Sequence, residues 1–259
     1  MKRTAAALLI MLSLGAAAAA QTLASKALRP RAKRAADGGA KSAPAGVDEV
    51  ERLLDRYVLA QGGLALSFVR TRIVRGAVEV SFSPQPGTFE MYEKAPTKSL
   101  IVFNAPGGQF IFATDGGKMW EKSPWSGVTT RGPVADDVLR PGGGKGFKWR
   151  SRFSSVRVKG RVLVEGRPAV ALAATPIGRD PIVLYFDVET GLLVKQELIR
   201  SGGKKPLALY MDSYATVDGM KVPAVFRQVG EGYTITFRVY EVKHNVSISD
   251  ALFRDPNAR

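Results

Sequence analysis

Two carboxylates stand close together in the segment YFDVETGLLV, residues 185 to 194, where Asp187 and Glu189 are two residues apart. Such a pair can act as general acid and base, supply half of a metal site, or lie at the tip of a β-hairpin. Thr190 and Gly191 follow, and Gly191 can adopt the positive φ that a bulged hairpin loop requires. The sequence favours a structural turn over a weak cation site or catalysis, because a loop tip cannot provide the buried environment that a glycosidase acid needs.

The other candidates for chemistry lack the partners that they would need. His244 is the only histidine, the chain has no cysteine, and no Gly-x-Ser-x-Gly nucleophile motif occurs. A catalytic triad or an ordinary zinc site requires more than this, so we expect His244 to end a strand. The segment PGGGKG, residues 141 to 146, lacks the Ser or Thr and the following helix of a phosphate-binding loop, and it is better interpreted as a flexible loop. The sequence therefore predicts no catalytic residue, metal site or cofactor, and no enzyme.

A basic segment, KWRSRFSSVRVKGR, spans residues 148 to 161 and contains no acid. In a strand, residues 148, 150 and 152 would share one face, and Trp149 and Phe153 would share the other. The basic face is either a solvated outer surface or a docking stripe for lipid head groups or an acidic protein. The candidate docking stripe consists of Lys148, Arg150, Arg152, Arg157 and Lys159.

Aromatic residues recur at every second position of several predicted strands. They could converge on one concave surface, either as ordinary core packing or as an apolar cavity for an acyl chain. The candidate ligand-binding residues are Phe89, Met91, Phe110, Phe112, Trp120, Trp125, Tyr185 and Tyr210.

The composition indicates a globular protein with an acidic partner. The chain has 259 residues, 45% of them hydrophobic, and a net charge of +15. Residues 21–46 contain six Lys or Arg and little apolar periodicity, which is typical of a flexible basic linker. Because part of the positive charge belongs to this linker, nucleic acid is not favoured as a partner of the folded domain. The favoured partners are an anionic membrane surface or an acidic envelope protein.

The N-terminus, MKRTAAALLIMLSLGAAAAAQ, has the form of a secretory signal peptide. Two basic residues precede a short apolar run, and small residues follow up to a predicted cleavage near Ala20. The apolar run is shorter than the ~20 residues of a membrane-spanning helix. We expect residues 1–20 to be removed and the mature chain to be soluble and periplasmic.

The rest of the sequence predicts one helix followed by an antiparallel meander. Apolar residues recur at helical spacing in VDEVERLLDRYVLAQGG, which begins at Val47, and a helical turn can follow at residues 64–68. Period-two alternation and Gly-containing turns then repeat about every ten residues. With so few helices the sheet must curl into a barrel or half-barrel to bury its apolar face. Between residues 134 and 146, one helical turn and the glycine-rich loop could form a lid.

Six segments occur in order along residues 47–253: VDEVERLLDRYVLAQGG, GTFEMYEKAPTKSL, DGGKMWEKSP, LYFDVETGLLVKQEL, YATVDGMKVPAVFRQ and ITFRVYEVKHNVSISDALF. Together they resemble a bacterial family described as outer-membrane lipoprotein-sorting-like proteins. The resemblance implies a mainly β fold: a half-open antiparallel β-barrel with an N-terminal helix and a helical or loop lid over a hydrophobic cavity. The sequence departs from the family by its glycine-rich segment, where relatives have a longer helical stretch.

The resemblance implies a domain over residues 47–259 that holds a lipid or the acyl chains of a lipoprotein, with transfer to the outer membrane as an extension of that function. The absence of a cysteine excludes the lipid anchor of a bacterial lipoprotein. The alternative is a non-enzymatic envelope module that binds an acidic protein or a glycan through its basic surface.

Overall fold

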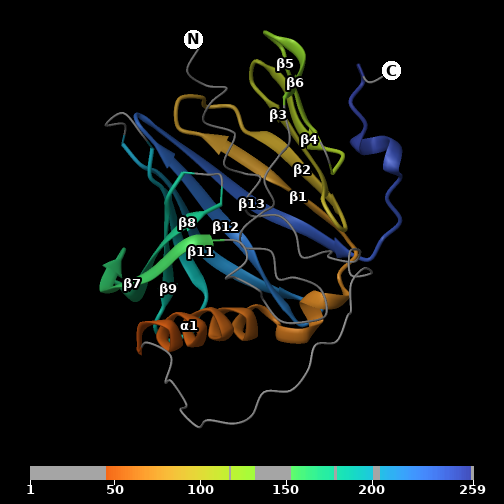
Figure 1. Ribbon diagram of the computed structural model, residues 1–259. Helices are drawn as coiled ribbons and strands as arrows, with labels where there is room; N and C mark the ends of the chain where they lie inside the picture. Colours follow the sequence, from red (N-terminus) through yellow and green to blue (C-terminus); the bar gives the residue numbers. More distant parts are fainter. Residues whose placement is uncertain (1–44, 117, 132–152, 178–179, 201–204, 258–259) are drawn as a thin grey trace, which may run out of the picture.

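The computed structural model describes residues 45–116, 118–131, 153–177, 180–200 and 205–257. The predicted signal peptide, most of the predicted linker and the expected lid lie outside these residues. A helix comes first, and a meander of strands follows it (Figure 1). None of the helices in the described ranges is long and apolar enough to span a membrane.

The helix predicted from the apolar periodicity is confirmed as α1 (Ala45–Gln61). Its buried side chains recur at helical spacing and comprise Val50, Leu54 and Tyr57. The helix stops at Gly62, where φ is 130° and a Cβ atom would lie 2.9 Å from the side chain of Met220. The predicted helical turn is also present, as the 3-10 helix η2 (Gly63–Phe68).

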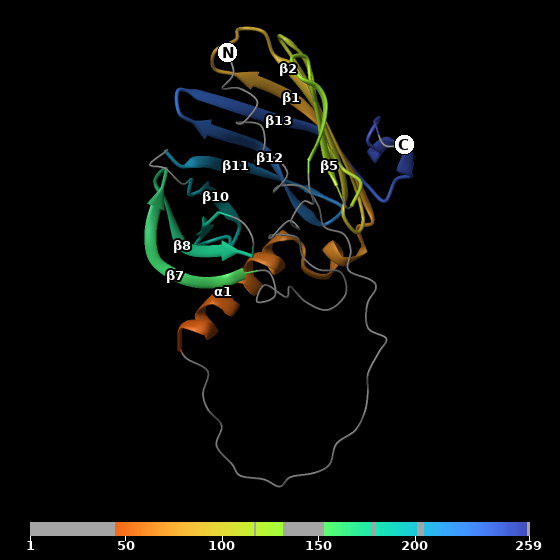
Figure 2. The same cartoon turned by 45° about the horizontal axis from the view of Figure 1, so that its top comes forward.

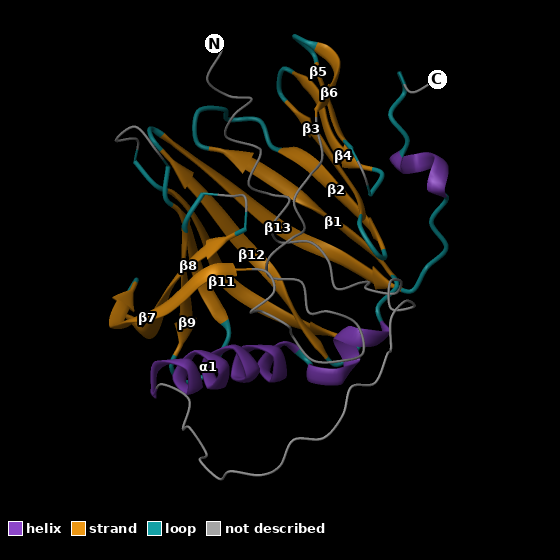
Figure 3. Ribbon diagram, in the orientation of Figure 1, coloured by secondary structure: helices purple, strands orange, loops and turns teal. Residues whose placement is uncertain are grey.

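All the strands of the described chain belong to one antiparallel sheet. They are β1 (Thr71–Val80), β2 (Gly87–Lys94), β3 (Lys98–Ala105), β4 (Gly108–Thr114), β5 (Met119–Ser123), β6 (Gly127–Arg131), β7 (Phe153–Val164), β8 (Arg167–Pro176), β9 (Ile182–Asp187), β10 (Leu193–Leu198), β11 (Leu207–Val217), β12 (Met220–Gly230) and β13 (Tyr233–His244). Consecutive strands pair within β1–β6 and within β7–β13, and β1 also pairs with β13, so that the two halves of the chain join in the middle of the sheet. The two edge strands of the sheet, β6 and β7, do not pair with each other. The predicted half-open barrel is therefore confirmed (Figure 3).

The sheet curls around an apolar core, and α1 lies across one end of it (Figure 2). We call the face that packs with α1 the inner face. Its side chains come from both halves of the sheet, and Tyr57 of α1 contacts Phe186 of β9 at a centroid distance of 5.2 Å. The helix therefore closes one end of the curl, while the hairpin turns at residues 81–86, 106–107, 124–126 and 231–232 lie at the other.

Part of the opposite, outer face is covered by the C-terminal segment, which includes the 3-10 helix η4 (Asp250–Phe253). Phe253 is fully buried against Trp120, and the Trp120 Nε1 donates a hydrogen bond of 3.0 Å to the Phe253 carbonyl oxygen. Ser249 caps η4 by accepting a hydrogen bond from the Ala251 amide. The chain end thus seals an apolar patch of β3, β4 and β5 that would otherwise face solvent.

Candidate functional site

The two carboxylates at residues 187 and 189 belong to a hairpin turn, as the sequence predicts. The Asp187 Oδ1 accepts hydrogen bonds from the amides of Glu189 and Thr190 and from the Thr190 hydroxyl, at 3.0, 2.7 and 2.9 Å. Gly191 adopts φ 75° and donates its amide to the Asp187 carbonyl. Burial would raise the pKa of Asp187, but the hydrogen bonds from Thr190 and Glu189 outweigh it and hold the pKa below its ordinary value.

This turn also anchors the helix. The Arg56 guanidinium of α1 donates to the carbonyl oxygens of Val188 and Glu189, both at 2.6 Å. A Cβ atom at Gly191 would lie 2.9 Å from Arg56, so glycine permits both the backbone conformation and the close approach of the arginine. The Asp187 carboxylate therefore stabilises the turn, and the backbone carbonyl groups of the turn help to position α1.

His244 ends β13, as expected, and its buried side chain contacts the Asp218 carboxylate at 2.8 Å. The described part of the chain contains no cluster of three His, Cys, Asp or Glu residues that could hold a metal ion.

Four of the predicted ligand-binding residues lie on the inner face. Phe89, Met91 and Phe112 are buried in the inner core, and half-buried Phe110 packs against it. Phe89 and Phe112 flank Phe103, with centroid distances of 6.4 and 6.3 Å. The inner face is thus lined by aromatic and aliphatic side chains, although whether these residues bind a ligand stays a prediction.

Trp125 continues this apolar surface to the rim. It lies in the β5–β6 turn, at the end away from α1, and is 57% exposed. Its ring contacts that of Phe110 at 5.1 Å in an edge-on geometry. A path of aromatic side chains therefore runs from the core through Phe110 to solvent.

The remaining three predicted residues lie on the outer face, so the prediction that all eight share one surface is wrong. Trp120 packs under the C-terminal segment, as described above. Tyr185 and Tyr210 flank the Lys195 ammonium, which lies 5.1 and 5.0 Å from their ring centroids. Burial, together with the hydrogen bond to Glu197, raises the pKa of Tyr185 above its ordinary value. Alternation along a strand shows which residues share a face but not which face is the inner one.

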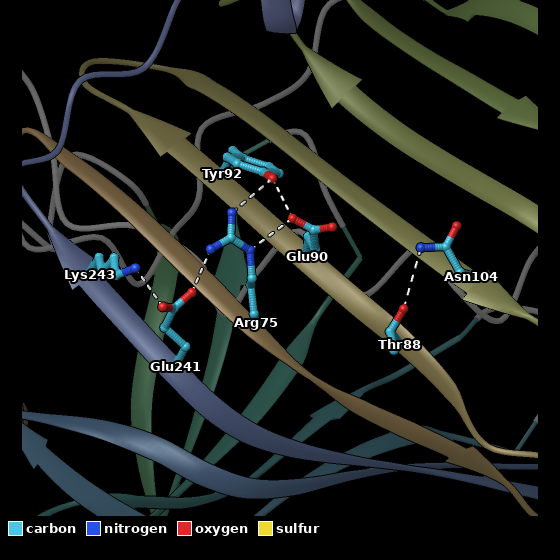
Figure 4. A network of polar contacts seen from close by, with 7 residues as sticks. All are labelled: Arg75, Thr88, Glu90, Tyr92, Asn104, Glu241 and Lys243. Atoms are coloured by element: carbon cyan, nitrogen blue, oxygen red, sulfur yellow. Dashed lines mark hydrogen bonds and ion pairs between the residues drawn. The ribbon is translucent and has the colours of Figure 1, made fainter.

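A second polar cluster on the outer face joins β1, β2 and β13 (Figure 4). Arg75 pairs with Glu90 and with Glu241, and the Tyr92 hydroxyl donates to Glu90. The hydrogen bonds from Tyr92 and Arg75 lower the pKa of Glu90. All members have partners within the cluster, which indicates a structural role for it.

The predicted basic docking stripe is only partly described. Lys148, Arg150 and Arg152 lie outside the described residues. Arg157 and Lys159 are exposed on β7, an edge strand of the sheet, while Val156 and Val158, which alternate with them, pack against the inner core. The strand alternation predicted for this segment is confirmed there, and the docking role stays a prediction.

Sequence reasoning missed Phe103, which is 2% exposed and lies between Phe89 and Phe112. It obeys the same period-two pattern in KSLIVFN, and this pattern was the signal that could have identified it. A row of polar residues at the α1 end of the inner face was also missed, because it exists only through the register between strands.

Comparison with known proteins confirms the fold that the resemblance implies. No family model matches the sequence, and no curated protein does. A DUF1329 family protein from Desulfovibrio piger is 16% identical, with 79% of this chain and 97% of that chain covered and a TM-score of 0.57. A LolA superfamily protein from Nitrosomonas europaea (11%, covering 79% and 96%, TM-score 0.54) and an outer membrane lipoprotein-sorting protein domain from Vibrio parahaemolyticus (12%, 81% and 98%, 0.52) are also similar. At these identities the likeness establishes the fold alone.

Proposed function

We propose that this chain, which shares the fold of lipoprotein-sorting proteins, binds a lipid or the acyl chains of a lipoprotein on its inner face. It would do so in the periplasm, after removal of the predicted signal peptide, and would carry the acylated ligand toward the outer membrane. The proposal involves no covalent chemistry. Its main support is the apolar core on the inner face of a sheet whose edge strands, β6 and β7, do not pair with each other.

The affinity would come from burying the acyl chain. Each buried methylene contributes about 0.8 kcal/mol, so each added methylene is expected to raise affinity about fourfold. Ordering of the chain and the loss of rigid-body freedom offset part of this gain. The half-open sheet suits such a ligand, because β6 and β7 can move apart without breaking a hydrogen-bonded ladder between these two strands.

We expect the purified protein to bind saturated fatty acids more tightly as their chain lengthens from eight carbons, until the inner face is filled. Displacement of a fluorescent fatty acid gives the dissociation constants, and native mass spectrometry gives the mass of any lipid that co-purifies from membrane-containing cells. A protein that carries no lipid and shows no dependence on chain length would contradict the proposal.

Neighbouring residues of β4 provide a matched pair of variants for this titration. Phe110 is half-buried on the inner face, and Ile111, also half-buried, packs on the outer face. Phe110→Ala should weaken binding several-fold, because the side chain borders the apolar path to the rim, whereas Ile111→Ala should leave binding unchanged. Equal effects of the two variants would mean that the inner face has no special part in binding.

The alternative function, an interaction module for an acidic envelope protein or a glycan, is supported by the exposed cations of β7. Arg157 and Lys159 project from an outer strand without an intervening acid. The two functions differ in their response to salt: binding to an acidic partner should weaken steeply as salt rises, whereas acyl-chain binding should not.

A further inference from the structure

A row of buried and half-buried polar side chains crosses the inner face next to the end that α1 and η2 occupy. The strand register aligns its members across five adjacent strands, each paired with the next. In order from β13 to β4, they are His244, Arg72, Glu93, Ser99 and Thr114. Glu93 is 3% exposed, and Ser99 and Thr114 are also buried.

The rows beside it are apolar. Two residues further along each strand, Val242, Val74, Met91, Ile101 and Phe112 align in the same way. The row after that contains Phe89, Phe103 and Phe110 and leads to Trp125 at the rim. Successive rows are separated by about 7 Å. The inner face therefore changes from polar to apolar along the strands, and a lipid with a small polar head and an acyl chain changes in the same order.

Hydrogen bonds within the described chain satisfy several groups of the row but not all. The Arg72 Nε donates to the Glu93 Oε2 at 2.6 Å. His244 contacts Asp218, and the Thr114 Oγ1 accepts from the Gly116 amide at 3.1 Å. The second carboxylate oxygen, Glu93 Oε1, is buried and accepts no hydrogen bond from any described residue.

A buried carboxylate oxygen without a donor is unfavourable, and buried polar atoms of native proteins nearly always have a partner. A carboxylate oxygen only accepts, so the missing partner must present an O–H or N–H group. Because Arg72 already balances the charge of Glu93, a neutral donor fits this position better than an anionic head group.

We propose that Glu93 Oε1 accepts a hydrogen bond from a hydroxyl of the lipid head, and that the protein therefore selects neutral, hydroxyl-bearing acyl lipids of the acylglycerol class. The inference rests on the proposed binding of acyl chains to the inner face. The head would lie at the polar row, and the acyl chain would follow the apolar rows toward Phe110 and Trp125.

The test compares two ligands with the same acyl chain, 1-palmitoylglycerol and methyl palmitate, of which only the first carries hydroxyl donors. We expect the wild-type protein to bind the glycerol ester about tenfold more tightly or better, since hydrogen bonds to charged groups are the strong ones. The measured quantity is the ratio of the two dissociation constants, from displacement of a fluorescent fatty acid.

The decisive variant removes both members of the ion pair, Arg72→Met with Glu93→Leu, so that the net charge of the row is unchanged. It should still bind methyl palmitate and should lose the preference for the glycerol ester. The matched control is Arg75→Met with Glu90→Leu, which removes the outer-face ion pair of the same two strands and should keep the wild-type ratio (Figure 4). Glu93→Gln, which preserves the side-chain shape, should lower the ratio in the same direction.

The outcomes separate the two proposals. If both esters bind the wild-type protein equally, or if the ratio survives in both Glu93 variants, the inference is overturned. If neither ester binds, the proposed function itself fails.

Discussion

Replacing Phe237 by alanine is expected to lower the free energy of unfolding by about 3–5 kcal/mol, the range for removal of a fully buried aromatic side chain. Phe237 is 0% exposed, stacks on Phe226 at 4.8 Å, and meets Phe89 and Phe103 edge-on at 5.4 and 5.9 Å. It lies on β13, which joins the two halves of the sheet through β1. Urea unfolding followed by circular dichroism would measure the change.

The control for this variant is Tyr240→Ala in the same strand. Tyr240 is 67% exposed, so its loss should change stability by no more than about 0.5 kcal/mol. Similar losses in the two variants would show that the aromatic cluster does not form the centre of the core.

The second large effect is expected at the C-terminal segment. Phe253→Ala should also lower the free energy of unfolding by about 3–5 kcal/mol, because the ring is fully buried over Trp120 and the outer face of β3 and β4. The indole should become more exposed, and the tryptophan emission should shift to longer wavelength. Urea unfolding and fluorescence spectra of the same samples would give both results.

Leu252→Ala is the matched control, since this neighbouring side chain is 40% exposed. It should leave the emission unchanged and stability within about 0.5 kcal/mol. The Phe253 variant should still bind fatty acids at temperatures where it is folded, because Trp120 lies outside the inner face. Loss of acyl binding in folded Phe253→Ala protein would contradict the assignment of Trp120 to a structural patch.

Local patterns in the sequence predict the elements of this fold well. The helical spacing of Val50, Leu54 and Tyr57 predicts α1, and Gly191 after Asp187 predicts the hairpin that α1 contacts. Each of these signals acts over a few residues: a helix period, a turn that needs a positive φ, an alternation with period two. A long succession of such hairpins with a single amphipathic helix leaves few ways to bury the apolar faces, so the half-open curl also follows.

The candidate site depends on longer-range information that such patterns lack. Trp120 fits the period-two pattern expected of a cavity residue, but it lies on the outer face, where the C-terminal segment covers it. Tyr185 and Tyr210 alternate correctly too, yet they hold Lys195 on the outer face. The polar row cannot be predicted from local sequence patterns, because Arg72, Glu93 and Ser99 become neighbours only through the pairing of separate strands.

The measurement that tests the central claim most directly is photo-crosslinking with a palmitic acid analogue that carries a diazirine in its acyl chain. Tandem mass spectrometry then locates each crosslink at residue level. Acyl binding on the inner face predicts crosslinks to half-buried inner residues such as Phe110 of β4 and Val156 and Val158 of β7, suppressed by excess unlabelled palmitate. Crosslinks confined to outer-face residues such as Tyr185 and Tyr210, or none that palmitate suppresses, would contradict it.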